Sequence, residues 1–471
     1  MNFIVYDIFL LIVFAIVVSG FLYKNRANLK KDGLLFLYKA SWGIKLINYV
    51  GNKYTKTLKV LSYVSIAIGY ILMGFMLYFL GRIIFIYTFM PDVVRAIKIP
   101  PIMPLIPYLP QAFKLDFLPP FYFTYWIIIL AVIAISHEFA HGIFAAYNKI
   151  KIKTTGFGFF PFFLPVFLAA FVELDEEKMQ KHKKLEQMAI LSAGTFANVL
   201  VAGFFLIILW LYFSVAFVAG GVQFNGYAYN TLLTNEITEI NNISLENPSY
   251  DQILEVMGNS SLADISVGEE IYSGIKAVSP EGEYVQLYYD APAIRDKIGA
   301  IITKINGVSV NSKETLALEI SKYSPGDKIT INGIDAEKEV SYEIELGDYP
   351  SEPGRAWLGI VFIPKSVSGI VGKMTQIVTS FKKENVYYKP RWDGISVFIY
   401  NLLWWLILIS ISVALVNMLP VGIFDGGRFF YLTVLGITGS PKIARKTFSA
   451  VTYLFLFLIL ALMFFWAWSF F

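Results

Sequence analysis

Three residues near the end of the first third of the chain have the types and the spacing of a metal hydrolase site. His137, Glu138 and His141 form a His-Glu-x-x-His sequence inside an apolar run from about Phe121 to Tyr147. On a helix, positions i and i+4 share one face, so both imidazoles can bind one ion while the carboxylate lies beside it. The pattern therefore predicts one Zn2+ per chain bound by His137 and His141, with Glu138 as the catalytic acid and base.

The surroundings of this motif strengthen the prediction. The apolar run is long enough to span a bilayer as a helix, and ionisable side chains in hydrocarbon are costly unless they are paired, metal-bound or hydrated. The chain contains three histidines and no cysteine. Thiolate zinc sites, disulfides and cysteine nucleophiles are therefore excluded, and a third protein ligand must be His182 or a carboxylate.

Four residues compete for the position of the third ligand. His182 lies in a lysine-rich loop, which is typical of a solvated surface. Glu173 or Asp175 could serve, as in soluble enzymes whose third ligand is a glutamate. Asp425 is an acidic residue in apolar surroundings at a break between predicted helices, and we favour it. The alternative role of Asp425 is a simple Asp-Gly turn. Such a turn would explain the glycine that follows but not the expected depth of Asp425 in the membrane.

The composition is that of a polytopic α-helical membrane protein. Of the 471 residues, 56% are hydrophobic and only 16% are charged, which is far more apolar than a soluble globular protein. We expect about six transmembrane helices, contact with the lipid bilayer and no nucleic-acid partner. The expected spans are residues 2–23, 58–90, 121–147, 188–217, 395–416 and 448–470.

The charge pattern predicts an orientation. Basic residues concentrate in loops 24–59, 148–186 and 428–446, whereas residues 220–365 are acidic. The positive-inside rule places those basic loops in the cytoplasm. Counting six crossings then places the N-terminus and residues 220–365 outside it. We therefore expect a multi-pass protein of the cell membrane, with the metal site in the cytoplasmic half of the bilayer.

Three segments are too irregular to be smooth helices. Residues 154–172 are apolar but interrupted by glycine and proline, which favours a re-entrant hairpin beside the site. Residues 417–428 combine one proline with three glycines, which predicts a discontinuous segment. The proline-rich residues 100–110 predict an ordered, extended outer loop, with a plain linker as the alternative.

Residues 220–365 read as an inserted α+β domain pair. Residues 237–245 and 302–310 are copies of one strand–turn–strand repeat, and each is followed by a helix-like stretch. The second copy, with residues 325–331, resembles a PDZ domain of the prokaryotic protease type, whereas the first is shorter and less regular. This resemblance implies binding of an extended peptide or a C-terminus by strand addition.

The chain accordingly divides into five expected parts. They are N-terminal transmembrane helices with the proline-rich loop (1–119), a membrane catalytic block (120–219), a tandem PDZ-like extracytoplasmic region (220–365), an amphipathic connector (366–394) and a C-terminal membrane block (395–471).

Three patterns can be compared with known families: His137-Glu-Phe-Ala-His141, Gly194-x-x-x-Asn198 and Asn417-x-x-Pro420-x-x-x-x-Asp425-Gly426. Together they resemble the motifs of site-2 proteases, the intramembrane zinc metalloproteases. Residues 170–175 and the proline-rich loop look most like those of archaeal members. The resemblance implies that His137, His141 and Asp425 bind zinc and that Glu138 is catalytic. It also implies cleavage within or near transmembrane segments of membrane-anchored substrates, in regulated proteolysis.

Asn198 and Asn417 are candidates for contacts with the substrate or the transition state. Each amide could donate to an oxyanion or hold the substrate strand extended. For Gly194-x-x-x-Asn198, close helix packing with one interhelical hydrogen bond is the alternative.

Two other classes of function compete with proteolysis. Intramembrane His, Glu and Asp with broken helices also describe a membrane zinc or ion transporter, although the two membrane halves show no evident inverted repeat. A catalytically inactive PDZ scaffold is the other, and the intact Glu138 argues against it.

Overall fold

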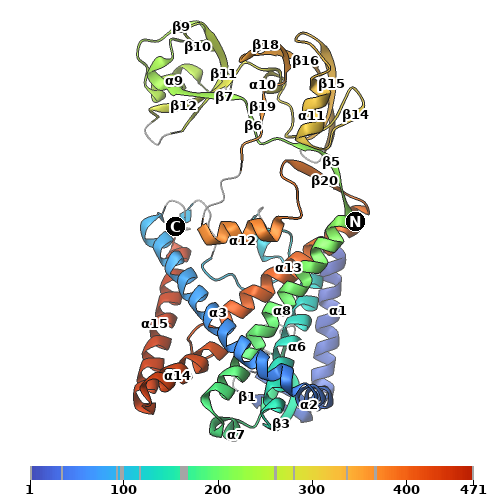
Figure 1. Cartoon of the computed structure of the whole chain (residues 1–471), viewed down its shortest axis with the longest axis vertical. Helices are drawn as coiled ribbons and strands as arrows, with labels where there is room; N and C mark the ends of the chain where they lie inside the picture. Colours follow the sequence, from blue (N-terminus) through green and yellow to red (C-terminus); the bar gives the residue numbers. More distant parts are fainter. Residues whose placement is uncertain are drawn as a thin grey trace. The chain divides into compact units, whose positions relative to one another are not determined.

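The computed structural model describes residues 3–32, 35–91, 94–95, 100–115, 118–159, 168–258, 262–278, 282–335, 338–364 and 369–468. The chain divides into two compact units, residues 1–209 with 398–471 and residues 210–397. The first unit is a bundle of helices, and the second is built mainly of strands (Figure 1).

Six helices in the described part of the chain are long and apolar enough to cross a membrane. They are α1 (Phe3–Lys24), α3 (Thr55–Phe89), α6 (Phe123–Tyr147), α8 (Lys184–Ala216), α13 (Asp393–Asn417) and α15 (Pro441–Trp468). These helices confirm the predicted spans and the multi-pass membrane class, although α15 begins earlier than expected.

Shorter helices lie between the spans. They are η1 (Arg26–Asn28), α2 (Ile44–Lys53), α5 (Leu109–Ala112), α7 (Glu176–Lys181) and α14 (Asp425–Thr438). The expectation of a basic loop over residues 428–446 was wrong, because α14 occupies its first part and α15 begins at Pro441. Two glycines at the start of α14 and its short length hid its helical periodicity.

Four strands form an antiparallel sheet within the helical unit. They are β1 (Leu29–Asp32), β2 (Leu35–Ala40), β3 (Ile152–Phe159) and β4 (Leu168–Leu174), in the order β1-β2-β3-β4. β3 and β4 form a hairpin within the segment expected to be re-entrant, and its tip, residues 160–167, lies outside the described residues. β4 packs against α6 and, among the described strands, pairs with β3 alone.

The proline-rich loop packs against the motif helix. Residues 100–108 contain no helix or strand, as proline at this density predicts. Trp126 Nε1 of α6 donates a hydrogen bond to the Leu105 carbonyl at 2.9 Å. The loop is therefore attached to the first turns of α6 rather than being a free linker.

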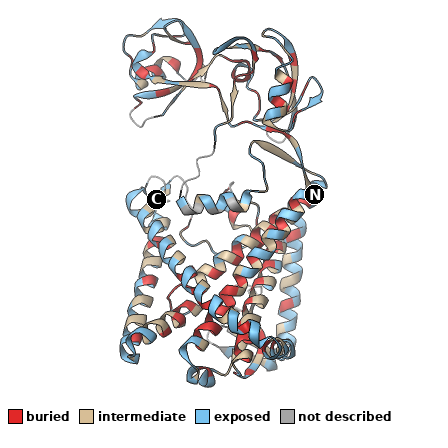
Figure 2. Ribbon diagram, viewed as in Figure 1, coloured by how far each residue is buried: buried red, intermediate tan, exposed pale blue. Residues whose placement is uncertain are grey.

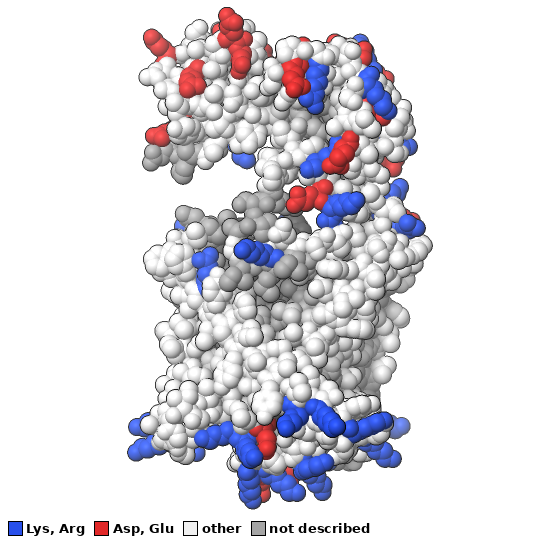
Figure 3. Space-filling model, in the orientation of Figure 1, with Lys and Arg blue, Asp and Glu red and all other residues white. Residues whose placement is uncertain are grey.

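The surface of the helical unit suits a bilayer. Buried residues concentrate between the helices, while outward faces are exposed (Figure 2) and bear large apolar side chains such as Phe9 and Ile207. The flanks show few charged groups, and Lys and Arg gather at the end that carries α2 and α7 (Figure 3). An apolar belt bounded by a basic band is the pattern expected of a membrane protein.

The second unit contains two larger sheets and two strand pairs. The first sheet has the order β7-β12-β11-β10-β8-β9 and the second has the order β16-β15-β13-β5-β20, with β14 paired to β13. The pairs are β17-β18 and β19-β6. The strands are β5 (Phe217–Gln223), β6 (Gly226–Tyr227), β7 (Tyr229–Leu233), β8 (Glu239–Ile240), β9 (Ile243–Ser244), β10 (Ile265–Val267), β11 (Glu270–Ala277), β12 (Tyr284–Tyr289), β13 (Ile301–Ile305), β14 (Val308–Ser309), β15 (Lys328–Asp335), β16 (Lys338–Glu345), β17 (Gly347–Tyr349), β18 (Glu352–Trp357), β19 (Ile360–Val361) and β20 (Val386–Pro390).

Five short helices lie in the described part of this unit. They are η3 (Thr234–Glu236), α9 (Tyr250–Met257), α10 (Pro292–Arg295), α11 (Lys313–Ile320) and α12 (Gly369–Thr379). α9 and α11 follow the two repeat copies, as the sequence predicts. Both hairpin turns use left-handed backbone, with φ of 49° at Asn241 and 46° at Asn306, which is the reason for asparagine and glycine at these positions. Each copy packs its own hydrophobic core.

Candidate metal centre and active site

The side chains of His137, His141 and Asp425 converge on one point. The two Nε2 atoms lie 3.1 Å apart, and each lies 3.3 Å from Asp425 Oδ2. Ligands about 2.0–2.1 Å from a tetrahedral zinc ion are separated from one another by about 3.3–3.4 Å. The three distances therefore fit three corners of a tetrahedron, and one corner remains for water or substrate.

Two local structures bring these ligands together. His137 and His141 are one helical turn apart on α6, and both side chains are nearly buried. Asp425 is the first residue of α14, after the turn that follows α13. The turn packs tightly on the start of α14, since a Cβ at Gly426 would lie 2.3 Å from a backbone atom of Met418. The break predicted from proline and glycine thus positions the third ligand.

Both imidazoles are oriented from α8. His141 Nδ1 lies 2.6 Å from the Ile190 carbonyl oxygen, so Nδ1–H donates and Nε2 remains free for a metal ion. His137 Nδ1 lies 3.1 Å from the side-chain amide of Asn198, which is fully buried and whose Oδ1 has no hydrogen-bond partner. Turning this amide by about 180° places Oδ1 against the Nδ1–H of His137 and gives both atoms a partner.

Gly194 allows α8 to approach the metal ligands. A Cβ at this position would lie 2.4 Å from His141 Nε2 and 2.6 Å from His137 Nε2. No side chain larger than hydrogen fits there unless the imidazoles move. The Gly-x-x-x-Asn motif therefore combines close packing with one polar contact to a metal ligand, whereas the sequence left these as alternatives.

Glu138 lies beside the cluster and contacts the sheet. Its Oε2 accepts a hydrogen bond from the backbone N–H of Val172 in β4 at 2.9 Å. Glu138, Asn417 and the three metal-binding side chains line one cavity of about 330 Å³. The remaining lining residues are Val172, Leu174, Glu176, Met179, Ile190, Leu191, Ile423, Phe424 and Arg428.

The competing candidates for the third ligand have other partners. Glu173 binds Lys39 and Thr154, which hold the pKa of its carboxyl below the usual value. Asp175 accepts from the backbone of Lys178 at the start of α7. His182 lies 2.9 Å from Glu186. In the described part of the chain, the cluster that could hold a metal consists of His137, His141 and Asp425.

Sequence reasoning missed Asp7 of α1. Its carboxylate is 1% exposed and accepts hydrogen bonds from the backbone N–H groups of Phe123 and Thr124 and from the Tyr108 hydroxyl. It thus caps the first turn of α6, the helix that carries the metal-binding histidines. An acidic residue inside an apolar span was the signal that could have revealed it.

The fold and the site together define a class of protein. Two histidines and an aspartate on helices of a multi-pass membrane protein, with a glutamate beside them, are the arrangement of an intramembrane metalloprotease of the HExxH type. The profile of peptidase family M50 matches residues 125–462. The chain therefore belongs to this family, and the resemblance to site-2 proteases is confirmed.

Two curated relatives share parts of the sequence. The zinc metalloprotease RasP of Shouchella clausii is 24% identical over 209 residues, which cover 39% of this chain and 49% of RasP. An uncharacterized protein of Methanocaldococcus jannaschii is 34% identical over 199 residues, which cover 41% of this chain and 48% of that protein. The chain thus spans about half the length of the curated relatives that it matches.

Proposed function

We propose that this protein is a zinc-dependent endopeptidase that hydrolyses peptide bonds within or near the transmembrane segments of membrane-anchored proteins, in regulated proteolysis. The observation that carries the proposal is the cluster of buried His137 and His141 with half-buried Asp425, which lines the same cavity as Glu138. The acidic insert and the N-terminus lie outside the cytoplasm, and the site lies in the cytoplasmic half of the bilayer.

The residues around the cavity divide the chemistry between them. Zinc, when bound to the three ligands, supplies Lewis-acid chemistry that makes water nucleophilic at neutral pH. Glu138 takes the proton of the attacking water and returns it to the leaving amine. Asn417, which lines the cavity, donates to the developing oxyanion or to the substrate backbone. Asn198 acts through its contact with His137, because it is fully buried and is not among the residues that line the cavity.

The free edge of β4 presents the substrate as a strand. The Val172 N–H points to Glu138, away from β3, and residues alternate along a strand, so Ala170 also directs its N–H and C=O to this edge. A helix hides its carbonyl groups in hydrogen bonds, so a substrate helix must unwind before hydrolysis. Pairing with β4 would hold the unwound segment extended beside Glu138.

A proline substitution tests this strand pairing. Ala170→Pro removes a donor from the free edge and leaves the β3–β4 hydrogen bonds intact, whereas Phe171→Pro removes one of those bonds. We expect Ala170→Pro to keep zinc and its thermal stability while losing most cleavage. Unchanged cleavage by Ala170→Pro would refute strand pairing at this edge.

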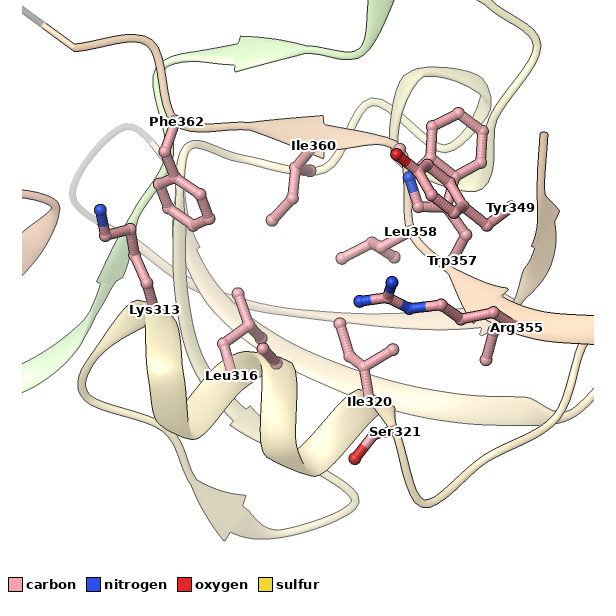
Figure 4. Close-up of a pocket in the computed structure, with 13 residues that line it drawn as sticks. Lys313, Leu316, Ile320, Ser321, Tyr349, Arg355, Trp357, Leu358, Ile360 and Phe362 are labelled. Atoms are coloured by element: carbon pink, nitrogen blue, oxygen red, sulfur yellow. The ribbon is translucent and has the colours of Figure 1, made fainter. Parts of the chain in front are cut away.

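The second repeat offers a site for a peptide partner. A cavity of about 270 Å³ lies between α11 and β19, with Leu316, Ile320 and Ile360 among its apolar lining and Arg355 and Lys313 along it (Figure 4). Among the described strands, β19 pairs with β6 alone. An extended peptide or C-terminus of a substrate would add as a strand to β19, with its carboxylate near a cation.

The enzymatic proposal is tested on a purified chain with a tagged single-span substrate protein. Glu138→Gln is expected to abolish cleavage while about one zinc per chain is retained. His141→Ala is expected to lose both cleavage and bound zinc. His182→Ala, which removes the histidine outside the cluster, is expected to keep cleavage and bound zinc. Cleavage by the Glu138→Gln variant, or zinc flux into vesicles without cleavage of any membrane helix, would overturn the proposal.

A further inference from the structure

An ion pair crosses the cavity that contains the metal ligands. Arg428 Nη1 lies 2.6 Å from Glu176 Oε2, although the two residues are far apart in the sequence. Both side chains line the same cavity as Glu138. The pair therefore joins two walls of the cavity.

Each residue of the ion pair lies on an element that positions a carboxylate of the site. Arg428 lies one helical turn after Asp425, the third metal-binding residue, on α14. Glu176 begins α7, with Asp175 alone between it and the end of β4, whose Val172 N–H binds Glu138. A change at this pair can thus move the metal-binding carboxylate relative to the catalytic carboxylate.

The pair is partly exposed and therefore reversible. The side chains are 30% exposed for Arg428 and 57% exposed for Glu176, and ion pairs of this kind contribute little to stability. The other end of α14 has a separate attachment, because Lys184 Nζ of α8 donates to the Leu435 carbonyl at 3.0 Å. Loss of the ion pair would release the contact between α7 and the exposed side of α14, while the packing of Gly426 and Phe429 and the attachment to α8 remain.

We propose that Arg428 and Glu176 are positioning residues that hold the cavity closed around the metal centre and keep α14 in register with β4. The expected effect of this ion pair on the rate of cleavage rests on the proposed proteolytic function. Its expected effect on access of small molecules to the cavity does not depend on that function.

Access can be measured directly because the chain contains no cysteine. Leu191 lines the cavity and is 7% exposed, so Leu191→Cys gives a single buried thiol for alkylation by a small maleimide in detergent. In this background, Glu176→Gln and Arg428→Gln are each expected to raise the alkylation rate about 1.4-fold to fivefold. That range is the population change that breaking one partly exposed ion pair allows.

Two further variants separate this interaction from a general effect of charge. Glu177→Gln neutralises the exposed neighbour of Glu176, for which the described residues show no ion pair, and it is expected to leave the rate unchanged. The exchange Glu176→Arg with Arg428→Glu is expected to return the rate toward that of the parent. Leu174→Cys on β4, which also lines the cavity, repeats the measurement if Leu191→Cys does not fold.

The outcomes decide the proposal in both directions. Equal alkylation rates in the parent and both single variants would overturn it, as would an exchange variant that alkylates as fast as the single variants. In a cleavage assay, both single variants are expected to lower kcat by a similar factor at unchanged thermal stability, and the exchange variant to recover it. If the parent protein cleaves nothing, the proteolytic function fails while the alkylation rates still test the ion pair.

Discussion

Replacing Gly194 with alanine should remove zinc from the protein without unfolding it. The added Cβ would lie 2.4 Å from His141 Nε2 and 2.6 Å from both Cε1 and Nε2 of His137. Non-bonded contacts of this type need about 3.5 Å, so the imidazoles or α8 must move by about 1 Å. Zinc–ligand distances in proteins tolerate only about 0.2 Å, so a shift of this size breaks the coordination geometry.

The size of the effect follows from related cases. Changes to the partners of metal ligands typically cost about 10–100-fold in affinity or activity, and here the ligands themselves are displaced. We therefore expect zinc affinity to fall at least about 100-fold. The overpacked helix contact should cost about 1–3 kcal/mol of unfolding free energy, which leaves a folded bundle.

A second glycine of the same helix provides the control. A Cβ at Gly203 meets no heavy atom within 4 Å. Gly203→Ala should therefore keep full zinc and gain up to about 1 kcal/mol from helix propensity. Zinc content is measured by mass spectrometry after equilibration with buffered free zinc, and thermal unfolding is measured in parallel. Equal zinc affinity in Gly194→Ala and Gly203→Ala would refute the close approach of α8 to the imidazoles.

Three further predictions concern the groups that support the metal centre. Asn198→Asp keeps an acceptor for the His137 Nδ1–H, so it should retain more zinc in the same buffers than Asn198→Leu. We expect Asn198→Leu to lower zinc affinity about 10–100-fold. Equal zinc retention by the two variants would contradict the amide orientation. Asp7→Ala leaves the first N–H groups of α6 and the half-buried Tyr108 hydroxyl without their acceptor. A buried donor without a partner costs about 1–3 kcal/mol, so Asp7→Ala should lower Tm by more than Asp7→Asn does. Removal of zinc by a chelator should lower Tm reversibly, because free zinc at about 1,000 times its Kd stabilises the folded protein by about 4 kcal/mol. A Tm that does not respond to added zinc would contradict a zinc site within the bundle.

The elements that carry local sequence signals were predictable. Each span is a long apolar run, and such runs must form helices because lipid cannot satisfy the backbone. His137 and His141 were predictable as a pair because their spacing equals one helical turn. Asp425 was favoured because an acid at a helix break in apolar surroundings needs a partner, and its approach to both imidazoles agrees with that reasoning.

Contacts between remote segments were not predictable. The sheet that positions Val172 includes β1 and β2, which are separated from β3 by α2, α3, the proline-rich loop, α5 and α6. Strand partners at that distance leave no periodic signal in the sequence. The Arg428–Glu176 pair is hidden for the same reason. The boundaries proposed for the five parts of the chain remain predictions, although the connector at 366–394 contains α12 and then β20, which pairs with β5.

Most of the polar groups described at the metal centre are satisfied by a neighbour, and the exceptions point to a cation. Glu138 has the Val172 N–H, and the two imidazoles direct their Nδ1 atoms to Ile190 and Asn198. What remains is two Nε2 lone pairs and a carboxylate oxygen, all acceptors, within about 3.3 Å of one another. Acceptors at this distance repel unless positive charge lies between them. A divalent cation provides that charge and, by binding all three, would join α6 to α14.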